Sequence, residues 1–257
     1  MDTKVLETLN YRRKAYVTTL KSSNEEEMKL PSPQKALYST MHNSHKGYRY
    51  VNQGIKTACD WIHLLRDGRG EIHNPWTDTP ITVVELGCGN GILCSLLVDM
   101  CFDVTGVDIY EGKIIYNRKG YKFIEHDLTK FPYPFKDNEF DYCLSFDVLE
   151  HLTENEIAAV LREMARISRG IFLKVSCHGI PPLHITIKTP GWWMNQLTTN
   201  CPDFSWQLLR NFERIAVDNG RVGSTVNTSS DIRPFKNGEK ITYAPLFHGK
   251  RGVIDED

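Results

Sequence analysis

Three glycines spaced two residues apart lie between a predicted strand and a predicted helix, in the sequence VVELGCGNG at residues 83–91. Gly87, Gly89 and Gly91 allow the backbone to turn sharply and to approach a ligand closely, because no side chain intervenes. In an open α/β sheet, ligands bind at the carboxyl ends of the strands, where the strand order reverses. The loop is therefore predicted to bind a ligand, by its composition and by its position.

The spacing and charge of this loop distinguish two classes of cofactor. A dinucleotide site requires Gly-x-Gly-x-x-Gly, with a pyrophosphate at the N-terminus of the next helix. Here Ile92 occupies the place of the third glycine, and Glu85 stands two residues before the first. A carboxylate there would repel a pyrophosphate and could pair with an ammonium group. The loop therefore favours a cofactor with a cationic amino-acid end over a nicotinamide dinucleotide.

Four ordered segments between about Ile81 and Val175 resemble the class I S-adenosylmethionine-dependent methyltransferases. VVELGCGNG resembles the first motif of that family, and VTGVDIY at residues 104–110 resembles the second. The stretch HDLTKFPYPFKDNEFDYCLSFDVLEHL at residues 126–152 resembles the next two. The resemblance implies S-adenosyl-L-methionine as the cofactor and methyl transfer as the activity.

The resemblance also implies roles for individual residues. Asp108, at the end of the second strand, would accept hydrogen bonds from the ribose hydroxyls, and Asp127 would meet the adenine amino group. Phe146, Asp147 and Val148 follow the fourth strand and would lie beside the cofactor. The predicted cofactor-binding residues are Glu85, Gly87, Cys88, Gly89, Gly91, Asp108, Ile109, Asp127, Leu128 and Phe146.

Structural alternatives exist for several of these residues. Asp108 could simply terminate a strand, and Asp127 could cap the turn formed by DLTK, because Asp is a common turn former. Glu85 could be a carboxylate at the surface end of a strand. Cys88 is interpreted as a small buried apolar residue in preference to a nucleophile.

Histidines near the expected active site are the candidates for proton removal. Methyl transfer to a hydroxyl requires the reacting atoms to be held in line and a proton to be removed. Histidine is the usual base because its pKa lies near neutrality. His184, His151 and Asp147 are the candidate catalytic residues, since they follow the fifth and fourth strands. The Leu-Glu-His-Leu string around His151 is common in the family and could instead be architectural.

The segment from His178 to Trp193 is the candidate acceptor wall. Trp192 could stack on a sugar ring or a flat ligand, and His178 and Lys188 could make polar contacts, so these three are the candidate substrate-binding residues. Trp192 and Trp193 could instead be core residues at a helix start. The segment weakly resembles the corresponding region of some methyltransferases that act on sugars or glycans. We therefore expect O-methylation of a small-molecule or glycan acceptor.

Two other functions compete with this interpretation. A nucleic-acid or nucleotide methyltransferase is the first alternative, but the adenine type carries a proline pair and an aromatic residue after the fourth strand, and the cytosine type carries Pro-Cys there. This chain has Ser145-Phe146-Asp147-Val148 at that position, and its 31 basic and 32 acidic residues give a net charge of −1. A dedicated polyanion binder is therefore disfavoured. The second alternative is a non-catalytic partner protein that binds the cofactor.

The elements around these motifs alternate between strands and helices. We predict strands at residues 81–86, 103–107, 121–125, 140–145 and 170–175, and helices at residues 92–100 and 153–168. This alternation indicates βαβ units and a mostly parallel sheet. Extended stretches at residues 204–209, 214–217 and 241–246 are expected to be antiparallel strands at one edge. The predicted fold is α/β, with a Rossmann-like seven-stranded sheet flanked by helices.

Two regions are expected along the chain. Residues 1–53 are predicted to be a helical extension that could act as a lid, and residues 54–257 a methyltransferase-like domain. Within the extension, histidine and aromatic side chains are concentrated between Tyr38 and Asn52. Loops near a site often carry function, which motivates the lid hypothesis.

Cysteine usage and hydropathy bound the cellular context. The seven cysteines are scattered without a Cys-x-x-Cys pair, which indicates neither a disulfide framework nor a structural zinc site, so no metal is expected. No apolar run approaches the length of a membrane span, and the first residues do not resemble a signal peptide. The chain is therefore expected to be cytoplasmic and to have no membrane partner.

Overall fold

The computed structural model describes residues 58, 61–62, 64–65, 72–109, 120–177, 184–218, 221–225 and 239–252. They contain one eight-stranded sheet in the order β3-β2-β1-β4-β5-β8-β6-β7. The parallel strands are β1 (Thr82–Leu86), β2 (Asp103–Asp108), β3 (Lys122–Glu125), β4 (Phe140–Phe146) and β5 (Ser168–Lys174). The antiparallel strands are β6 (Phe204–Asp218), β7 (Arg221–Thr225) and β8 (Glu239–Arg251). The predicted fold class is confirmed.

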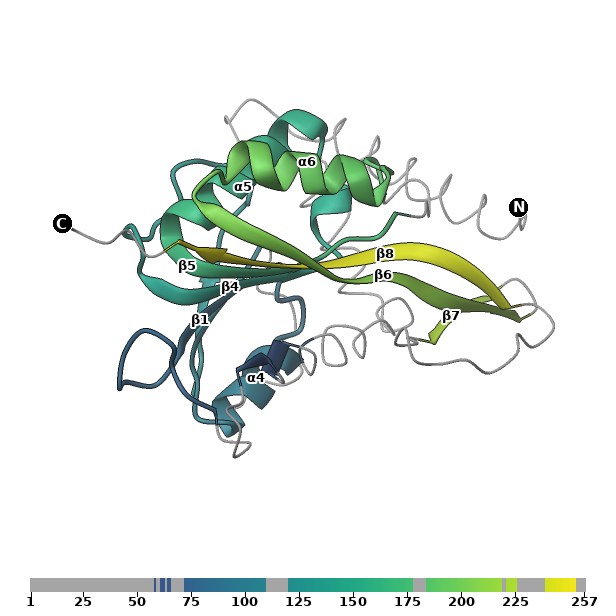
Figure 1. Cartoon of the computed structure of the whole chain (residues 1–257). Coiled ribbons are helices and arrows are strands. Elements are labelled where there is room, and N and C mark those ends of the chain that lie inside the picture. Colours follow the sequence, from purple (N-terminus) through teal and green to yellow (C-terminus); the bar gives the residue numbers. More distant parts are fainter. Residues whose placement is uncertain are drawn as a thin grey trace, which may run out of the picture.

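Helices cover both faces of the sheet. Figure 1 shows α5 (Glu154–Ile167) and α6 (Pro190–Asn200) on one face and α4 (Ile92–Asp99) on the other. Each face has its own hydrophobic cluster, with Val160 of α5 in one and Leu97 of α4 in the other. β4 lies between them and is buried at six of its seven residues, because a parallel strand covered on both faces has no solvent side.

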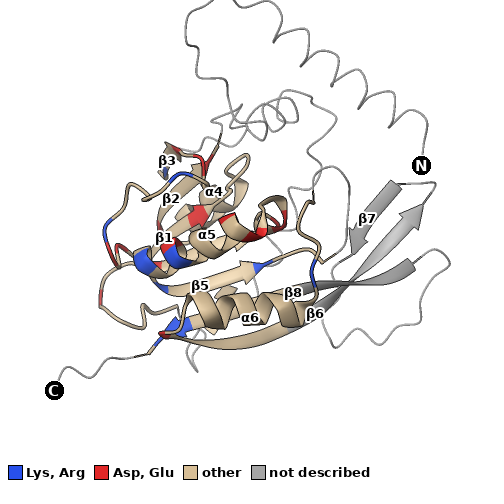
Figure 2. Cartoon of the chain, turned by 90° about the horizontal axis from the view of Figure 1, so that it is seen from above, with Lys and Arg blue, Asp and Glu red and all other residues tan. Residues whose placement is uncertain are grey.

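The helix α5 forms as its sequence predicts. Thr153 and Glu156 form a capping box, in which each side chain accepts from the other residue's backbone N–H. Its buried residues recur at helical spacing and are Ile157, Val160, Leu161, Met164 and Ile167. Acidic residues lie in its first turn and Arg166 in its last, and both complement the helix dipole. Figure 2 shows acidic positions in red and basic positions in blue on α5.

The C-terminal strands differ from the expected pattern. The stretches at residues 204–209 and 214–217 belong to a single 15-residue strand, β6, whose pairing with β8 shifts register near Arg210. Such bulges interrupt the alternation of side chains between the two faces of the sheet. A single bulged strand therefore has the sequence pattern of two shorter strands. β7 pairs with the far end of β6 and adds an eighth strand at the sheet edge.

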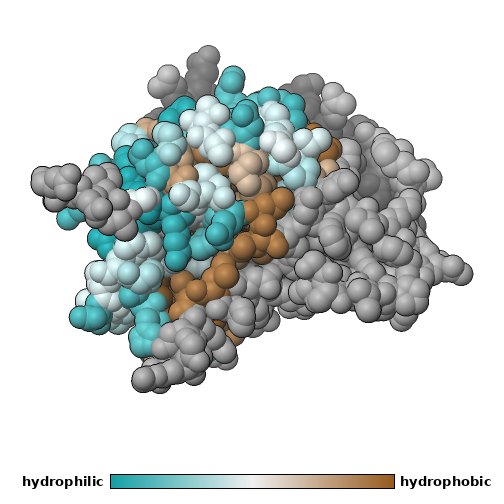
Figure 3. Space-filling view, viewed as in Figure 1, coloured by the Kyte–Doolittle hydropathy of each residue, from teal (hydrophilic) through white to brown (hydrophobic). Residues whose placement is uncertain are grey.

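The predicted extension at residues 1–53 and the segment Tyr38–Asn52 lie outside the described residues. Ala58, Ile62 and Leu65, which precede β1 in the sequence, are buried in the hydrophobic cluster that contains Leu97 of α4. Within the described parts of the chain, no helix combines the length and apolar character needed to cross a bilayer. Figure 3 shows a face that is mainly hydrophilic in its described part, with a band of hydrophobic residues across it.

Candidate functional site

A cleft opens where β1, β2 and β4 end. The strand order places β2 and β3 on one side of β1 and β4 and β5 on the other, so the chain reverses direction across the sheet between β1 and β4. This switch point is where open α/β sheets bind ligands. The cleft encloses about 650 Å³, including its open mouth. It is lined by Gly87, Asp108, Ile109, Asp127, Leu128, Phe146, Asp147, Val148, His151 and Leu152.

The glycine loop forms the floor of this cleft. Gly87, Gly89 and Gly91 all have positive φ, at 76°, 56° and 73°. A Cβ atom on Gly87 would lie 2.4 Å from Val148 Cγ2, closer than side chains tolerate. The first glycine therefore serves both the turn and the close approach of the loop to the segment after β4.

Asp108 closes the cleft at the end of β2. Its side chain is buried, and its Oδ2 accepts a 2.8 Å hydrogen bond from the backbone N–H of Gly89. A buried carboxylate beside a glycine loop is suited to accept hydroxyl hydrogen bonds from a ligand. The carboxylate acceptor predicted at the end of the second strand therefore lies beside the glycine loop and lines the cleft.

Asp127 both caps a turn and faces the cleft. Its Oδ1 accepts from the backbone N–H of Thr129 at 2.9 Å and from the Thr129 hydroxyl at 2.7 Å. Asp127 and Leu128 also line the cleft. Asp127 therefore caps the turn formed by DLTK, as the structural alternative predicted. It also lies where a ligand in the cleft can reach it. Tyr133 supports this loop by donating its hydroxyl to the carbonyl of Leu128 at 2.9 Å.

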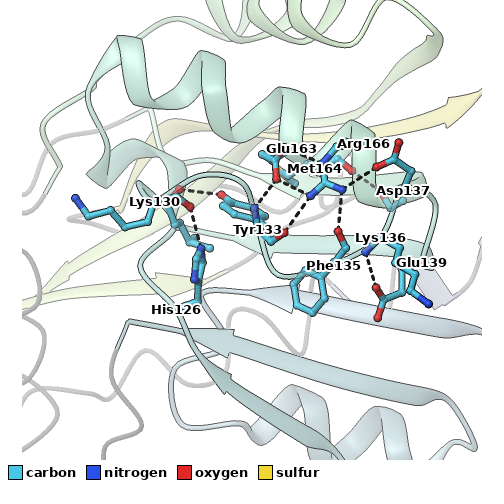
Figure 4. A network of polar contacts seen from close by, with 12 residues as sticks. His126, Lys130, Tyr133, Phe135, Lys136, Asp137, Glu139, Glu163, Met164 and Arg166 are labelled. Atoms are coloured by element: carbon cyan, nitrogen blue, oxygen red, sulfur yellow. Dashed lines mark hydrogen bonds and ion pairs between the residues drawn. The ribbon is translucent and has the colours of Figure 1, made fainter.

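A polar network ties the loop that carries Asp127 to α5 (Figure 4). Arg166 donates to the carbonyls of Phe135 and Tyr133 and to the carboxylates of Asp137 and Glu163. Glu163 in turn accepts from the backbone N–H of Tyr133 at 2.7 Å. The hydrogen bonds from Arg166 lower the pKa of the Glu163 carboxyl. The network therefore fixes the connection between β3 and β4, and with it one wall of the cleft.

Asp147 occupies a strained position at the end of β4. Its φ is +55°, which is uncommon for a residue other than glycine. Its Oδ2 pairs with Lys174 Nζ at 2.8 Å, and the Lys174 side chain is only 1% exposed. Sequence reasoning missed Lys174, although a lysine within the apolar stretch GIFLKV of β5 was a signal that it is paired.

His151 and His184 come together at the end of the cleft near η1, a 3₁₀ helix at Leu149–His151. Their ring centroids are 4.8 Å apart and the rings meet edge to face at 83°. His151 lines the cleft, and His184 contacts the His151 ring without being part of the lining. These two candidate catalytic residues thus converge from segments that follow different strands.

Glu150, beside His151, is the second residue that sequence reasoning missed. Its side chain is fully buried, and its Oε1 accepts from the backbone N–H of Ser176 at 3.2 Å. Burial, followed by the nearby charge of Asp147, raises the pKa of the Glu150 carboxyl well above its ordinary value. The residue belongs to the Leu-Glu-His-Leu string, whose acidic member was read only as family architecture.

The candidate acceptor residues are placed apart from the cleft lining. Lys188 pairs with Glu154 at 2.5 Å and lies 5.4 Å from the ring centroid of Trp192, so both join the first turns of α5 and α6. Trp193 is fully buried, as its core alternative requires, and Trp192 is half-buried. His178 lies outside the described residues.

Glu85 is buried beneath the glycine loop. Cys94 Sγ donates to its Oε2 at 3.0 Å, and burial raises the pKa of the Glu85 carboxyl to about 8. The surface alternative for Glu85 is therefore wrong, because only 6% of the residue is exposed. Cys88 is also buried, in agreement with its interpretation as a small apolar residue.

Comparison with known proteins agrees with this geometry. Residues 84–172 match the family described as a methyltransferase domain. A probable S-adenosylmethionine-dependent methyltransferase of Mycobacterium tuberculosis is 34% identical over 91 residues, which are 34% of this chain and 32% of the relative. One from Mycolicibacterium smegmatis is 32% identical over 96 residues, which are 35% of this chain and 36% of the relative. The matched region thus spans about a third of these curated relatives.

Solved structures share the fold at low sequence identity. The 1,6-didemethyltoxoflavin-N1-methyltransferase of Burkholderia thailandensis superposes with a TM-score of 0.58 at 12% identity, over 90% of this chain and 92% of that one. The YcgJ protein of Bacillus subtilis gives a TM-score of 0.54 at 16% identity, over 77% and 98%.

The strand order and the glycine loop after β1 define a Rossmann-like fold of the class I methyltransferase type. Residues 84–172 therefore belong to the methyltransferase-domain family, and the curated relatives that this region matches are probable S-adenosylmethionine-dependent methyltransferases.

Proposed function

We propose that the chain is a methyltransferase that binds S-adenosyl-L-methionine in the cleft at the ends of β1, β2 and β4. The observation that carries this proposal is the buried Asp108 carboxylate, held by Gly89 beside a glycine loop that leaves no room for a Cβ atom at position 87.

The lining residues fit the two halves of such a cofactor. Asp108 would accept hydrogen bonds from the ribose hydroxyls, and Asp127 would meet the adenine amino group. Ile109, Leu128 and Phe146 supply apolar surface for a flat ring. The remaining predicted cofactor residues, Glu85, Cys88, Gly89 and Gly91, do not line the cleft, and they would support the loop that carries Gly87.

Bound S-adenosyl-L-methionine supplies an electrophilic methyl group on a positively charged sulfur. The chain's own contribution is to hold an acceptor in line with that group and to handle the proton that the acceptor loses. His151 lines the cleft with His184 against it, so an imidazole is available to take a proton from a hydroxyl. Lys174 fixes Asp147 at the same end.

A hydroxyl on a small molecule or a glycan is the acceptor that these residues favour. The paired histidines suit deprotonation of a hydroxyl group. The net charge of −1 gives no general attraction for a polyanion such as a nucleic acid. Lys188 and Trp192 would contact a larger acceptor that extends beyond the cleft toward α6.

The test is methyl transfer by the full chain with a methyl-labelled cofactor. The acceptors would be a panel of phenols, sugars and oligosaccharides beside short single- and double-stranded oligonucleotides. Label transferred to a hydroxyl-bearing small molecule or sugar supports the proposal. Transfer only to oligonucleotides would overturn the choice of acceptor, and absence of cofactor binding by calorimetry would overturn the proposal itself.

A further inference from the structure

Three side chains that could ligate a metal ion meet beside the cleft. Glu150, His151 and His184 each offer one ligand atom, and these atoms all lie within 4.8 Å of one another. Glu150 is fully buried, and its Oε2 has no hydrogen-bond partner among the described residues. A buried carboxylate oxygen without a donor is unfavourable unless a cation or a proton meets it. A metal ion held by the three side chains would meet this oxygen.

The backbone holds this cluster together. The carbonyl oxygen of Glu150 accepts from the N–H groups of both Ile185 and Thr186 at 3.0 Å. The buried Thr186 hydroxyl donates to the carbonyl of Leu152 at 2.5 Å. These bonds hold the segment after β5 against η1 at Glu150 and at Leu152, on either side of His151 in the sequence, and they bring His184 against His151. The juxtaposition is thus built by three hydrogen bonds from one short segment.

We propose that Glu150, His151 and His184 bind a divalent first-row transition-metal ion. Two imidazoles and one carboxylate suit ions such as Zn²⁺, Co²⁺ and Mn²⁺, whereas Mg²⁺ and Ca²⁺ prefer oxygen ligands. Ligand atoms about 2.1 Å from a common ion lie roughly 3–4 Å apart, so shifts of about 1 Å would close the site. Both histidines are only half-buried, which leaves their rings room to move.

The place of the site gives the ion a role. His151 lines the cleft, so positions on the ion not filled by protein would face the acceptor end. A bound ion lowers the pKa of a hydroxyl beside it. With the ion bound, the proton would pass to water and not to an imidazole, because both histidines would then be ligands. This role rests on the proposed function, but binding of the ion does not.

The test is titration of the full chain, treated with a chelator and dialysed, with Co²⁺ followed by visible absorption and with Zn²⁺ followed by calorimetry. We expect one equivalent to bind and Mg²⁺ to compete poorly. His184→Ala and Glu150→Gln should each weaken binding by about tenfold or more. His73→Ala, at an exposed histidine away from η1, is the matched control and should bind as the unaltered chain does.

Equal affinity of the unaltered chain and His184→Ala would overturn the proposal, as would the absence of Co²⁺ binding. Thermal melting of each variant identifies loss of fold. If Glu150→Gln does not fold, the Co²⁺ affinity of His184→Ala alone tests the proposed site. S-adenosylhomocysteine binding, measured on the same samples with and without chelator, separates the two proposals. A chain that binds Co²⁺ but no S-adenosylhomocysteine contradicts only the proposed function.

Discussion

The backbone N–H of Gly89 donates a 2.8 Å hydrogen bond to Asp108 Oδ2, across 19 residues of sequence. The bond joins the loop after β1 to the end of β2, two neighbouring parallel strands paired from Thr82 to Leu86. The loop and the carboxylate consequently form one unit, and a change in either should be felt by the other. Substitutions in this unit, and in the residues that pack against it or hold the neighbouring wall of the cleft, test whether this arrangement forms the cofactor site.

Replacing Gly87 by Ala should reduce both stability and cofactor affinity. The new Cβ would lie 2.4 Å from Val148 Cγ2 at a φ of +76°, so steric overlap and backbone strain add. We expect the free energy of unfolding to fall by about 1–3 kcal/mol in urea denaturation. Gly87→Ala combined with Val148→Ala should recover part of this loss, because only the backbone strain persists.

The matched control for this substitution is Gly191→Ala in α6. The nearest atom to its new Cβ would be Thr189 Oγ1 at 4.0 Å, so no overlap arises. Its stability should be unchanged or raised by up to about 1 kcal/mol. If Gly87→Ala proves as stable as Gly191→Ala, the close approach between the loop and Val148 is not required.

Removing the Arg166 side chain should loosen the wall that carries Asp127. Arg166→Ala deletes hydrogen bonds to Phe135, Tyr133 and Glu163, and we expect unfolding in urea to become easier by about 1–3 kcal/mol. Arg162→Ala is the control, since its exposed contact with Asn200 should be worth little. Similar losses for the two variants would show that the network does not hold the loop.

The Arg166 contribution should also depend on pH. Because Arg166 lowers the pKa of Glu163 from its ordinary value of 4.5, the stabilisation is present above that pH and is lost as the pH falls further. The difference between the unaltered chain and Arg166→Ala should therefore shrink in acid. A difference that stays constant from pH 6 to pH 3 would contradict the ion-pair interpretation.

Glu85→Gln should stabilise the protein at alkaline pH. The pKa of Glu85 is 4.5 ordinarily and about 8 in the fold, so between these values the folded chain keeps a proton that the unfolded chain loses. Stability of the unaltered chain then declines with rising pH across this window, by at most about 1.4 kcal/mol per pH unit from this group. Gln does not titrate, so the variant escapes the decline.

The measurement is urea denaturation at pH 5, 7 and 9. The advantage of Glu85→Gln should grow from pH 5 to pH 8 and then level off. Glu125→Gln, at the exposed end of β3, serves as the control and should follow the unaltered chain. Parallel curves for Glu85→Gln and the unaltered chain would mean that Glu85 is ionised in the fold.

The parallel half of the sheet could be predicted because its signals are local. Each strand from β1 to β5 is a short apolar run between turn residues, and the predicted bounds agree within two residues. The α6 helix was also within reach, since Thr189 caps it and Pro190 occupies its first turn. The bulges in β6 could not be predicted from the sequence, because they depend on how β6 pairs with β8.

The candidate site divides in the same way. Gly87, Asp108 and Asp127 stand at fixed offsets from predicted strands, so their convergence on one cleft follows from a parallel sheet. The pairing of Lys174 with Asp147 and the burial of Glu150 depend on how the segment after β5 folds back over η1. No local sequence pattern predicts that the segment after β5 folds back over η1. The pairing of Lys174 with Asp147 and the burial of Glu150 are therefore visible only in the structure.

Binding of S-adenosyl-L-methionine by Asp108→Ala tests the central claim most directly. Each hydrogen bond from a ligand hydroxyl to a carboxylate is worth about 1.5–3 kcal/mol, so calorimetry should show affinity at least about tenfold weaker than that of the unaltered full chain. Asp103→Ala, at the exposed start of the same strand, should bind normally. Equal affinities for the two variants, with both folded by circular dichroism, would contradict the assignment of this cleft as the cofactor site.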